Sequence, residues 1–276
     1  MRWAAAWLAA AALSGQAVKF DAVPEATIRA RLEEAPAKNA GREAAVRALF
    51  ERVGCPGGAL VEQAVKHAKW PNVICTMAGT ANEAIVVGAH FDFVERGKGV
   101  VDNWTGASLL PSLYESLKTV RRRHTLVFVA FTDEELGLVG SRFYVKRLGE
   151  EGSRRIAAMV NLDSLGTSPT KMELTRADPG LARGLAAVAL ALKLPLGVVN
   201  VHLVGRSDSD SFQDRGVPAI DVHSLTQKTF PILHSSADRM EAVSFQDYYD
   251  SYRLVAGYIA YLDGTLGEAG GSGPIR

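Results

Sequence analysis

Acidic and imidazole side chains stand at the ends of three apolar runs in this 276-residue chain. The β-branched run over residues 84–91 includes His90 and is followed at once by Asp92. The runs over residues 125–132 and 156–162 are also followed directly by acids. These acids are Asp133, Glu134, Glu135 and Asp163. Every one of these side chains is of a type that holds a divalent metal ion or transfers a proton.

Two more residues of the same chemistry lie between the expected elements. Asp102 precedes a helical pattern, and His234 follows an apolar run before the last helical pattern. Taken singly, such residues are more often helix caps, core histidines or solvated charges than ligands. Burying Asp102, Glu135 and Asp163 together is costly without cations, and no run of Lys or Arg lies near them in the sequence. A positive centre is therefore expected, and histidine with carboxylate favours zinc.

Alternating apolar patterns indicate how these residues are positioned. Strands are predicted over residues 84–91, 125–132, 156–162, 197–203 and 217–222. Helices are predicted over 105–117, 138–148, 180–192 and 244–262, and an N-terminal helical cap over 26–34, 41–53 and 59–69. The fold class is α/β, a mixed and largely parallel sheet between helices in a single domain with an N-terminal helical segment. Because ligands in such sheets bind beyond the carboxyl ends of the strands, the acids meet there.

Composition and charge narrow the possible functions. Hydrophobic residues make up 47% and charged residues 22% of the chain, which excludes a disordered or fibrous protein. Lys and Arg total 31 against 30 for Asp and Glu, so no overall positive field favours nucleic acid as a partner.

The first seventeen residues are typical of a secretory signal peptide, with a positive start, an apolar run and small residues near the end. The run is too short for a stable membrane span. We therefore divide the chain into a signal peptide at 1–17, an enzyme domain at 18–264 and a flexible tail at 265–276. A secreted or periplasmic location favours one disulfide between Cys55 and Cys75 over two free thiols.

The order of these motifs resembles that of the co-catalytic dizinc aminopeptidases of peptidase family M28, of the bacterial secreted type. The resemblance runs from about residue 84 to the last helix. It rests on His90-x-Asp92, Asp102-Asn103-x-x-Gly106, Asp133-Glu134-Glu135-x-Gly137-x-x-Gly140-Ser141, Asn161-Leu162-Asp163 and His234-Ser235-Ser236-x-Asp238. The segment Gly205-Arg206-Ser207-Asp208, with Phe212 and Gly216-Val217-Pro218-Ala219, is also similar to the family.

The resemblance implies a ligand set for two zinc ions per chain. His90 and Asp163 would hold one ion, Glu135 and His234 the other, and Asp102 would bridge both. The peptide bond after the bridging Asp is often cis in the family. The implied activity is hydrolysis of N-terminal residues from peptide substrates by a metal-bridging hydroxide.

The resemblance also implies roles for residues around the metals. Glu134 would be the general base, and the carboxylate of Asp92 would accept a hydrogen bond from the imidazole of His90 and fix its tautomer. The carboxylates around the metals would recognise the free α-amino group of the substrate. Arg206 would contact the substrate from the other side.

Departures from the family pattern leave alternatives open. Leu233 replaces a Tyr that helps to stabilise the oxyanion, Ser209 replaces the His of Ser-Asp-His, and Asn103 replaces a second acid. A glutaminyl cyclase on the same fold is one alternative, although Trp104 is the only Trp within the metal motifs. A binding ectodomain without catalysis is another. His223 at a strand end is a candidate for a supporting or substrate-binding role.

Overall fold

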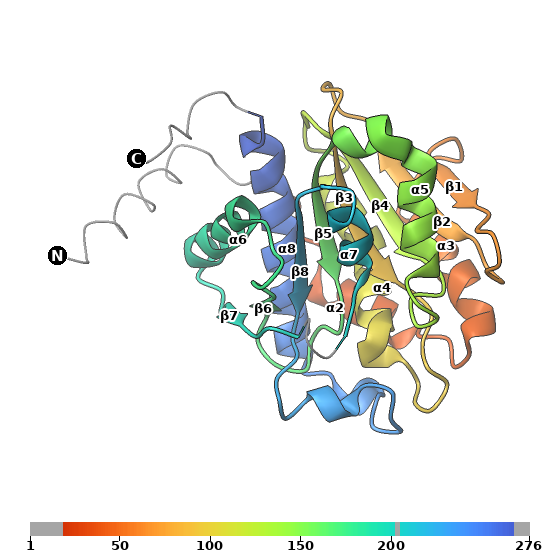
Figure 1. Ribbon diagram of the computed structural model, residues 1–276. Coiled ribbons are helices and arrows are strands. Elements are labelled where there is room, and N and C mark those ends of the chain that lie inside the picture. The colour runs from red at the N-terminus through yellow and green to blue at the C-terminus, as the bar shows by residue number, and fades with distance from the viewer. Residues whose placement is uncertain (1–18, 202–204, 268–276) are drawn as a thin grey trace.

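A mixed β-sheet forms the middle layer of the computed structural model, which describes residues 19–201 and 205–267 (Figure 1). The strands found there are β1 Leu60–Gln63, β2 Asn72–Met77, β3 Ala84–His90, β4 Thr125–Phe131, β5 Ile156–Leu162, β6 Lys171–Met172, β7 Gly197–Val198 and β8 Ala219–His223. Their order across the sheet is β1-β2-β4-β3-β5-β8-β6-β7.

The central strands are parallel. β3 pairs in parallel with both β4 and β5, and β5 pairs in parallel with β8. The pairs β1–β2, β2–β4 and β6–β8 are antiparallel. The carboxyl ends of β3, β4 and β5 therefore reach one edge of the sheet, as predicted.

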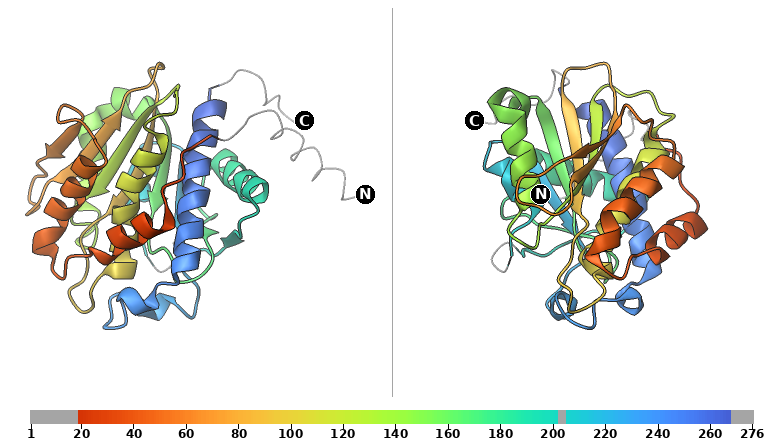
Figure 2. Two further views of the ribbon diagram at one scale, coloured as in Figure 1. Left: turned by 180° about the vertical axis from the view of Figure 1, so that it is seen from behind. Right: turned by 90° about the vertical axis from the view of Figure 1, so that its right-hand side faces the viewer.

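Helices cover both faces of this sheet. They are α2 Glu25–Glu33, α3 Arg42–Arg52, α4 Thr105–Leu117, α5 Val139–Arg154, α6 Pro179–Leu192, α7 Asp208–Gln213 and α8 Phe245–Thr265. In Figure 1, α5 and α7 lie in front of the sheet, and the view from behind in Figure 2 shows α2, α3, α4 and α8 on the other face. The short helical segments are η1 Asn39–Gly41, η2 Val100–Trp104, η3 Phe230–Ile232 and η4 Met240–Ala242. The predicted α/β sandwich is confirmed.

Alternate residues of the central strands pack into two separate hydrophobic cores. Val87 and Phe128 belong to the cluster formed with α2, α3, α4, α6 and α8, whereas Val86 and Val129 belong to the cluster formed with α5 and α7. Successive side chains of a strand point to opposite faces, so a strand covered on both faces is apolar at every position. This explains why the central strands were visible in the sequence as unbroken apolar runs.

The predicted helix over residues 59–69 is wrong. Its first part forms β1, which pairs antiparallel with β2 so that Leu60 faces Cys75 and Gln63 faces Asn72. A helix of about ten residues is marginal on its own, so backbone pairing with a neighbouring strand overrides the local pattern. The N-terminal cap therefore has two main helices, and the strand β2 was not predicted. Of the strand predicted over 197–203, residues 197–198 are extended in β7, and 202–204 lie outside the described residues.

The predicted disulfide between Cys55 and Cys75 is present, with the Cα atoms 6.4 Å apart. It joins the segment just after α3 to β2, and both cysteines are buried. The predicted signal peptide lies outside the described residues, as does most of the predicted tail, and α8 extends to Thr265. No helix in the described parts of the chain is long and apolar enough to span a membrane.

Candidate active site

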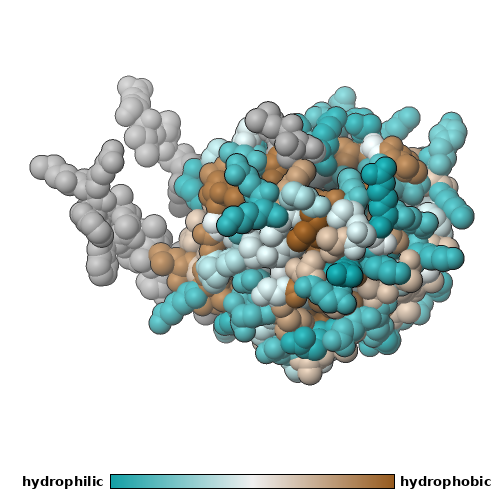
Figure 3. All heavy atoms as spheres, turned by 90° about the horizontal axis from the view of Figure 1, so that it is seen from below, coloured by the Kyte–Doolittle hydropathy of each residue, from teal (hydrophilic) through white to brown (hydrophobic). Residues whose placement is uncertain are grey.

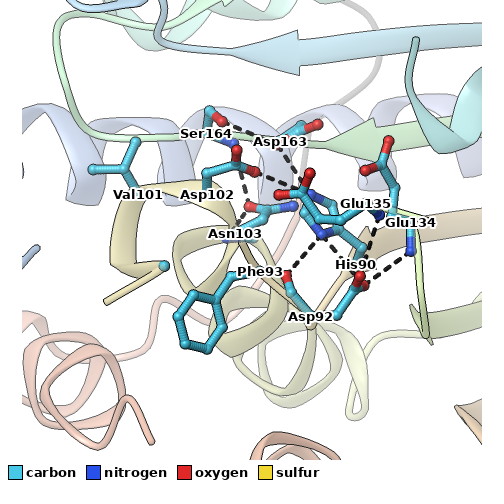
Figure 4. A network of polar contacts seen from close by, with 12 residues as sticks. His90, Asp92, Phe93, Val101, Asp102, Asn103, Glu134, Glu135, Asp163 and Ser164 are labelled. Carbon is cyan, nitrogen blue, oxygen red and sulfur yellow. Dashed lines mark hydrogen bonds and ion pairs between the residues drawn. The ribbon is translucent and has the colours of Figure 1, made fainter. Parts of the chain in front are cut away.

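His90, Asp102 and Asp163 converge at the carboxyl edge of the sheet (Figure 4). His90 is the last residue of β3, Asp163 follows β5, and Asp102 lies in η2 between β3 and α4. The His90 Nε2 atom is 3.2 Å from Asp102 Oδ1 and 3.5 Å from Asp163 Oδ1. One donor atom from each of three separate segments is thus available to a single ion.

A second group is formed by Asp102, Glu135 and His234. The Nε2 atom of His234 is 3.1 Å from Asp102 Oδ2 and 2.9 Å from Glu135 Oε2. Glu135 follows β4, whereas His234 comes from the segment between β8 and α8, about a hundred residues later in the chain. The structure brings all five predicted ligands together, and Asp102 belongs to both groups.

The donor atoms of both groups fit zinc. Ligands about 2.1 Å from one tetrahedral ion lie about 3.4 Å from each other, and the four distances above are between 2.9 and 3.5 Å. The Nδ1 atom of His90 is 3.0 Å from the backbone oxygen of Asp92, which can only accept a hydrogen bond. Nδ1 therefore carries a proton, and Nε2 faces the carboxylates, where it can bind a metal ion once it has lost its own proton.

The residue that accepts the hydrogen bond of His90 is Asp92, as expected, but the accepting atom differs from the expectation. The Asp92 carboxylate Oδ1 is 3.6 Å from His90 Nδ1, beyond hydrogen-bond distance, and the backbone oxygen takes its place. The carboxylate instead accepts hydrogen bonds from the backbone amides of Glu134 (3.0 Å) and Glu135 (3.2 Å). Asp92 therefore fixes the two glutamates of the site as well as the histidine.

Asp102 is held by its neighbour Asn103 through a cis peptide bond, as the resemblance implied. The Asn103 amide donates to the Leu162 oxygen, and its Oδ1 accepts from the backbone amides of Gly106 and Ser164. An aspartate at this position could not donate to the Leu162 oxygen. A Cβ atom on Gly106 would lie 2.6 Å from both Asn103 Oδ1 and the Leu162 oxygen, so this turn requires glycine.

The accumulated negative charge perturbs the titration of the site. Burial alone would lower the pKa of His90, but the charges of Glu134 and Asp163 and the hydrogen bonds of the carboxylates raise it well above its usual value. Burial and the charge of Asp102 raise the pKa of Glu135 to about 7. The hydrogen bond with Asp102 raises the pKa of His234 to about 9. In the absence of a metal ion, the site therefore retains protons to balance its carboxylates.

Glu134 lies beside both ligand groups without belonging to either. Its carboxyl group lines the same pocket as Asp102, Asp163 and His234. Burial, followed by the charges of nearby acids including Asp163, raises its pKa well above the usual value, although the charge of His90 acts in the opposite direction. A carboxyl group with a raised pKa takes up a proton more readily than an exposed one does.

A buried cation, which does not belong to any run of Lys or Arg in the sequence, lies behind the site. Arg42, in the first turn of α3, is fully buried, and its guanidinium donates to the backbone oxygens of Phe91, Lys98 and Gly99 at 2.7 to 3.0 Å. It also stacks on the Phe93 ring, with Cζ 4.1 Å from the centroid. Burial lowers the pKa of Arg42 to about 10, so it stays charged at neutral pH. The sequence analysis did not predict a role for Arg42 because it lies far from the acids along the chain.

The segment Ser207–Ser209 supports a further acid that the sequence analysis did not select. The hydroxyls of Ser207 and Ser209 each donate to the Asp221 carboxylate at 2.6 Å, and the Asn161 amide donates at 2.9 Å. Burial still raises the pKa of Asp221 to about 6. Ser209, which replaces the histidine of the family pattern, therefore binds a carboxylate on β8.

A cavity of about 340 Å³ opens above the two ligand groups. Its apolar lining includes Leu138, Leu225, Phe230 and Leu233, and the last of these offers no side-chain donor. On the face seen from below, apolar residues gather near the centre, and hydrophilic residues surround them (Figure 3). The cavity therefore combines an acidic floor with an apolar wall.

His223 also lines the cavity but cannot bind a metal ion there. Its Nδ1 accepts from the Leu225 amide, so Nε2 carries the proton and donates to the Val199 oxygen at 2.9 Å. Both ring nitrogens are occupied, and burial lowers the pKa of His223. His223 therefore ties the segment after β7 to β8 in a supporting role.

Known proteins are similar to this chain in sequence or in fold. A curated relative, "Aminopeptidase YwaD" of Bacillus subtilis, is 29% identical over 170 residues, which cover 59% of this chain and 37% of the relative. The chain spans about a third of the length of the curated relatives it matches.

Solved structures with the same fold include the LapA aminopeptidase of Legionella pneumophila, with a TM-score of 0.74 and 20% identity. It aligns over 91% of this chain and 78% of its own. A glutaminyl cyclase from an Acidobacteriales bacterium has a TM-score of 0.72 at 16% identity, and it aligns over 87% of this chain and 93% of its own. At these identities the likeness concerns the fold alone.

The family model "Peptidase family M28" matches residues 72–259, which is more than half of the chain. The match begins in β2 and ends within α8, so it contains all the strands that carry the ligand groups. The chain therefore belongs to peptidase family M28.

Proposed function

We propose that this protein is an aminopeptidase that holds two zinc ions and removes N-terminal residues from peptides. One observation carries the proposal: Asp102 supplies one carboxylate oxygen to each of two histidine-containing groups. A carboxylate shared in this way suits two ions close together, the arrangement found in two-metal aminopeptidases. His90 and Asp163 would complete one site, and Glu135 and His234 the other.

Bound zinc polarises a carbonyl group and lowers the pKa of water. Glu134 accepts the proton of the attacking water and returns it to the leaving nitrogen, because its raised pKa suits both steps. Asp92 orients Glu134 through the backbone amide. The surrounding carboxylates attract the free α-amino group of a peptide, and the wall around Leu225 and Phe230 accepts an apolar side chain.

Glutaminyl cyclase remains the alternative from the same fold. A cyclase encloses its substrate between aromatic rings and usually works with one zinc. Phe230 is the only Phe, Tyr or Trp among the described residues that line the cavity, and the shared Asp102 favours two ions. Both observations support the aminopeptidase. A binding domain without catalysis is the third possibility, and the presence of Glu134 beside the ligand groups argues against it.

We also propose that the chain is exported to the periplasm or the medium after removal of residues 1–17. The disulfide between Cys55 and Cys75 supports this proposal, because such bonds persist in oxidising compartments.

The test compares two adjacent glutamates in the zinc-loaded protein. Glu134→Gln keeps the size of the side chain but cannot accept a proton, so zinc content should stay near two per chain while kcat for a leucine anilide falls about 10²- to 10⁴-fold. Glu135→Gln removes an anionic ligand and should lower the zinc content. Glu150→Gln, on the exposed surface of α5, is the matched control and should leave both unchanged.

Metal analysis and a glutaminyl peptide separate the alternatives. Close to two zinc ions with release of the N-terminal residue supports the aminopeptidase. One ion with conversion of the peptide to its pyroglutamyl form, seen by mass spectrometry, supports the cyclase instead. Zinc binding with no turnover of either substrate supports the binding domain. Loss of zinc in Glu134→Gln, with zinc retained in Glu135→Gln, would reverse the two roles.

A further inference from the structure

Three guanidinium groups line the cavity, and two of them are neutralised by carboxylates. Arg206 donates from Nε to Asp210 at 2.8 Å and from Nη2 to Asp214 at 3.1 Å. Arg176 is paired with the same two carboxylates, at 3.3 Å in the case of Asp214. These two arginines and two aspartates form a closed group whose charges balance.

The third guanidinium, that of Arg142, has no such partner. No carboxylate of the described residues forms an ion pair or hydrogen bond with its side chain, which is exposed in the first turn of α5. The backbone amide of Arg142 donates a hydrogen bond to the Leu138 oxygen at 3.0 Å, which fixes the backbone of Arg142 at the start of α5. A cation without an ion-pair partner among the described residues thus stands at the wall of the cavity, where an anion from outside can bind it.

Arg142 belongs to the same stretch of the cavity wall as Glu134, the proposed general base. The Leu138 amide donates to the Glu134 oxygen at 2.8 Å, and the Arg142 amide donates to the Leu138 oxygen, so the three residues belong to one hydrogen-bonded segment. A general base that returns its proton to the leaving nitrogen must touch that nitrogen. With Glu134 in the proposed role, the residues beyond the scissile bond lie on the side of the cavity that Glu134, Leu138 and Arg142 line.

Size favours a short leaving group. An extended chain advances about 3.3–3.6 Å per residue, so a carboxylate one or two residues past the scissile bond lies within about 7 Å of it. The cavity of about 340 Å³ is near the lower end of the range for small-ligand sites. A dipeptide or tripeptide can fill it while its terminal carboxylate remains near the wall.

We propose that Arg142 binds a carboxylate on the leaving side of the substrate and thereby selects short peptides. The planar guanidinium can donate two parallel hydrogen bonds to a carboxylate, which a lysine cannot reproduce. The carboxylate is either the C-terminus of a dipeptide or tripeptide or an acidic side chain after the scissile bond. This inference rests on the proposed aminopeptidase function.

The experiment compares kcat/KM for two substrates of the same enzyme sample. A loss of folded enzyme lowers both values equally, so their ratio is unchanged. For zinc-loaded enzyme, kcat/KM is determined for Leu-Ala and for its amide, which lacks the terminal charge. The wild type should prefer the free acid, and Arg142→Gln should lower the preference about 10-fold, the effect of one charged hydrogen bond. Arg142→Lys should lie between them. Arg147→Gln, at an exposed position of the same helix outside the cavity, should match the wild type.

A second pair of substrates, Leu-Asp-amide and Leu-Asn-amide, identifies the source of the carboxylate. If Arg142→Gln reduces the preference for Leu-Ala over its amide, Arg142 binds the C-terminal carboxylate. If it reduces the preference for Leu-Asp-amide over Leu-Asn-amide, Arg142 binds the acidic side chain. Either result supports the proposal. Equal ratios in the wild type and Arg142→Gln for both pairs would overturn it, as would an equal loss in Arg147→Gln.

Binding of an uncleavable analogue separates this inference from the proposed function. Calorimetry on Leu-Ala with a reduced scissile bond, and on its amide, reports recognition without turnover. If the wild type cleaves no peptide but binds the free acid more tightly, and Arg142→Gln abolishes the difference, the catalytic proposal fails and the carboxylate site stands. If cleavage occurs and neither assay responds to Arg142, only the carboxylate site fails.

Discussion

Replacement of Arg42 by Met should destabilise the metal-free protein by about 3–5 kcal/mol. The reason lies in the contacts of the guanidinium, which is fully buried and donates to the backbone oxygens of Phe91, Lys98 and Gly99. A buried carbonyl that loses its donor costs about 1–3 kcal/mol. Methionine would fill much of the space on the Phe93 ring but could satisfy none of the three oxygens.

Two further variants show whether charge or geometry matters. Arg42→Lys keeps the positive charge but loses the planar fork that spans the carbonyls, so a loss of about 1–3 kcal/mol is expected. Arg52→Met, at the other end of α3, removes an exposed guanidinium that pairs with Glu34 on the surface. Such a pair is worth about 0–1 kcal/mol, and this variant is the matched control.

The assay is urea unfolding in the presence of a chelator, followed by fluorescence and by circular dichroism. The free energies of unfolding come from midpoints and slopes, and coincident transitions check the two-state assumption. If Arg42→Met loses no more stability than Arg52→Met, the guanidinium does not hold the segment between β3 and η2, and the role inferred from its hydrogen bonds is refuted. If Arg42→Lys is as unstable as Arg42→Met, the geometry of the fork matters and the charge does not.

Two more predictions concern the rest of the domain. Cys55→Ser should lower the free energy of unfolding by about 2–4 kcal/mol under non-reducing conditions, because it removes the disulfide. The wild type should show no free thiol after denaturation without reductant, and two titratable thiols would contradict the disulfide. Burial raises the pKa of Asp221 from 3.8 to about 6, so the native state holds this proton more tightly, and stability is lost as the pH rises from 4 through 6. The urea midpoint of Asp221→Asn should therefore change less between pH 4 and 6 than that of the wild type. The same pH dependence in both proteins would contradict the raised pKa of Asp221.

Much of the site was predictable because its residues follow buried parallel strands. A strand covered on both faces leaves an unbroken apolar run in the sequence, so the positions of His90 and Asp163 at the ends of β3 and β5 could be read directly. The same logic placed Glu134 and Glu135 after β4. His234 comes from a loop, so the sequence marked it only as a histidine after an apolar run, and the resemblance of its motif implied its place in the ligand set.

Other features depended on tertiary contacts that no local pattern records. The segment Leu60–Gln63 became a strand because β2 offered it backbone partners, and its own composition indicated a helix. Arg42 lies about fifty residues before the first acid of the site, and nothing in its neighbourhood marks it as buried. The carbonyl of Asp92, and not its carboxylate, faces His90, a choice made by the turn after β3.

The position of Asp102 shows how the fold prepares the shared ligand. The Asp238 carboxylate accepts from the backbone amides of Val101 and Asp102, at 2.7 and 3.3 Å. On the side before this segment, Arg42 binds the Gly99 oxygen, and on the side after it, Asn103 binds to the end of β5. The segment is thus held at both ends and in the middle by groups outside the two ligand sets.

Such support matters because carboxylates that face one another repel. The hydrogen bonds of the histidines outweigh the burial of Asp102 and lower its pKa below the usual range, so this carboxylate stays charged while Glu135 holds a proton more readily. A flexible segment would relieve the repulsion by moving Asp102 away from Asp163 and Glu135. Because Asp238, Arg42 and Asn103 prevent that movement, folding itself keeps the charged donor atoms at ligand distance, and less ordering remains for the moment of metal binding.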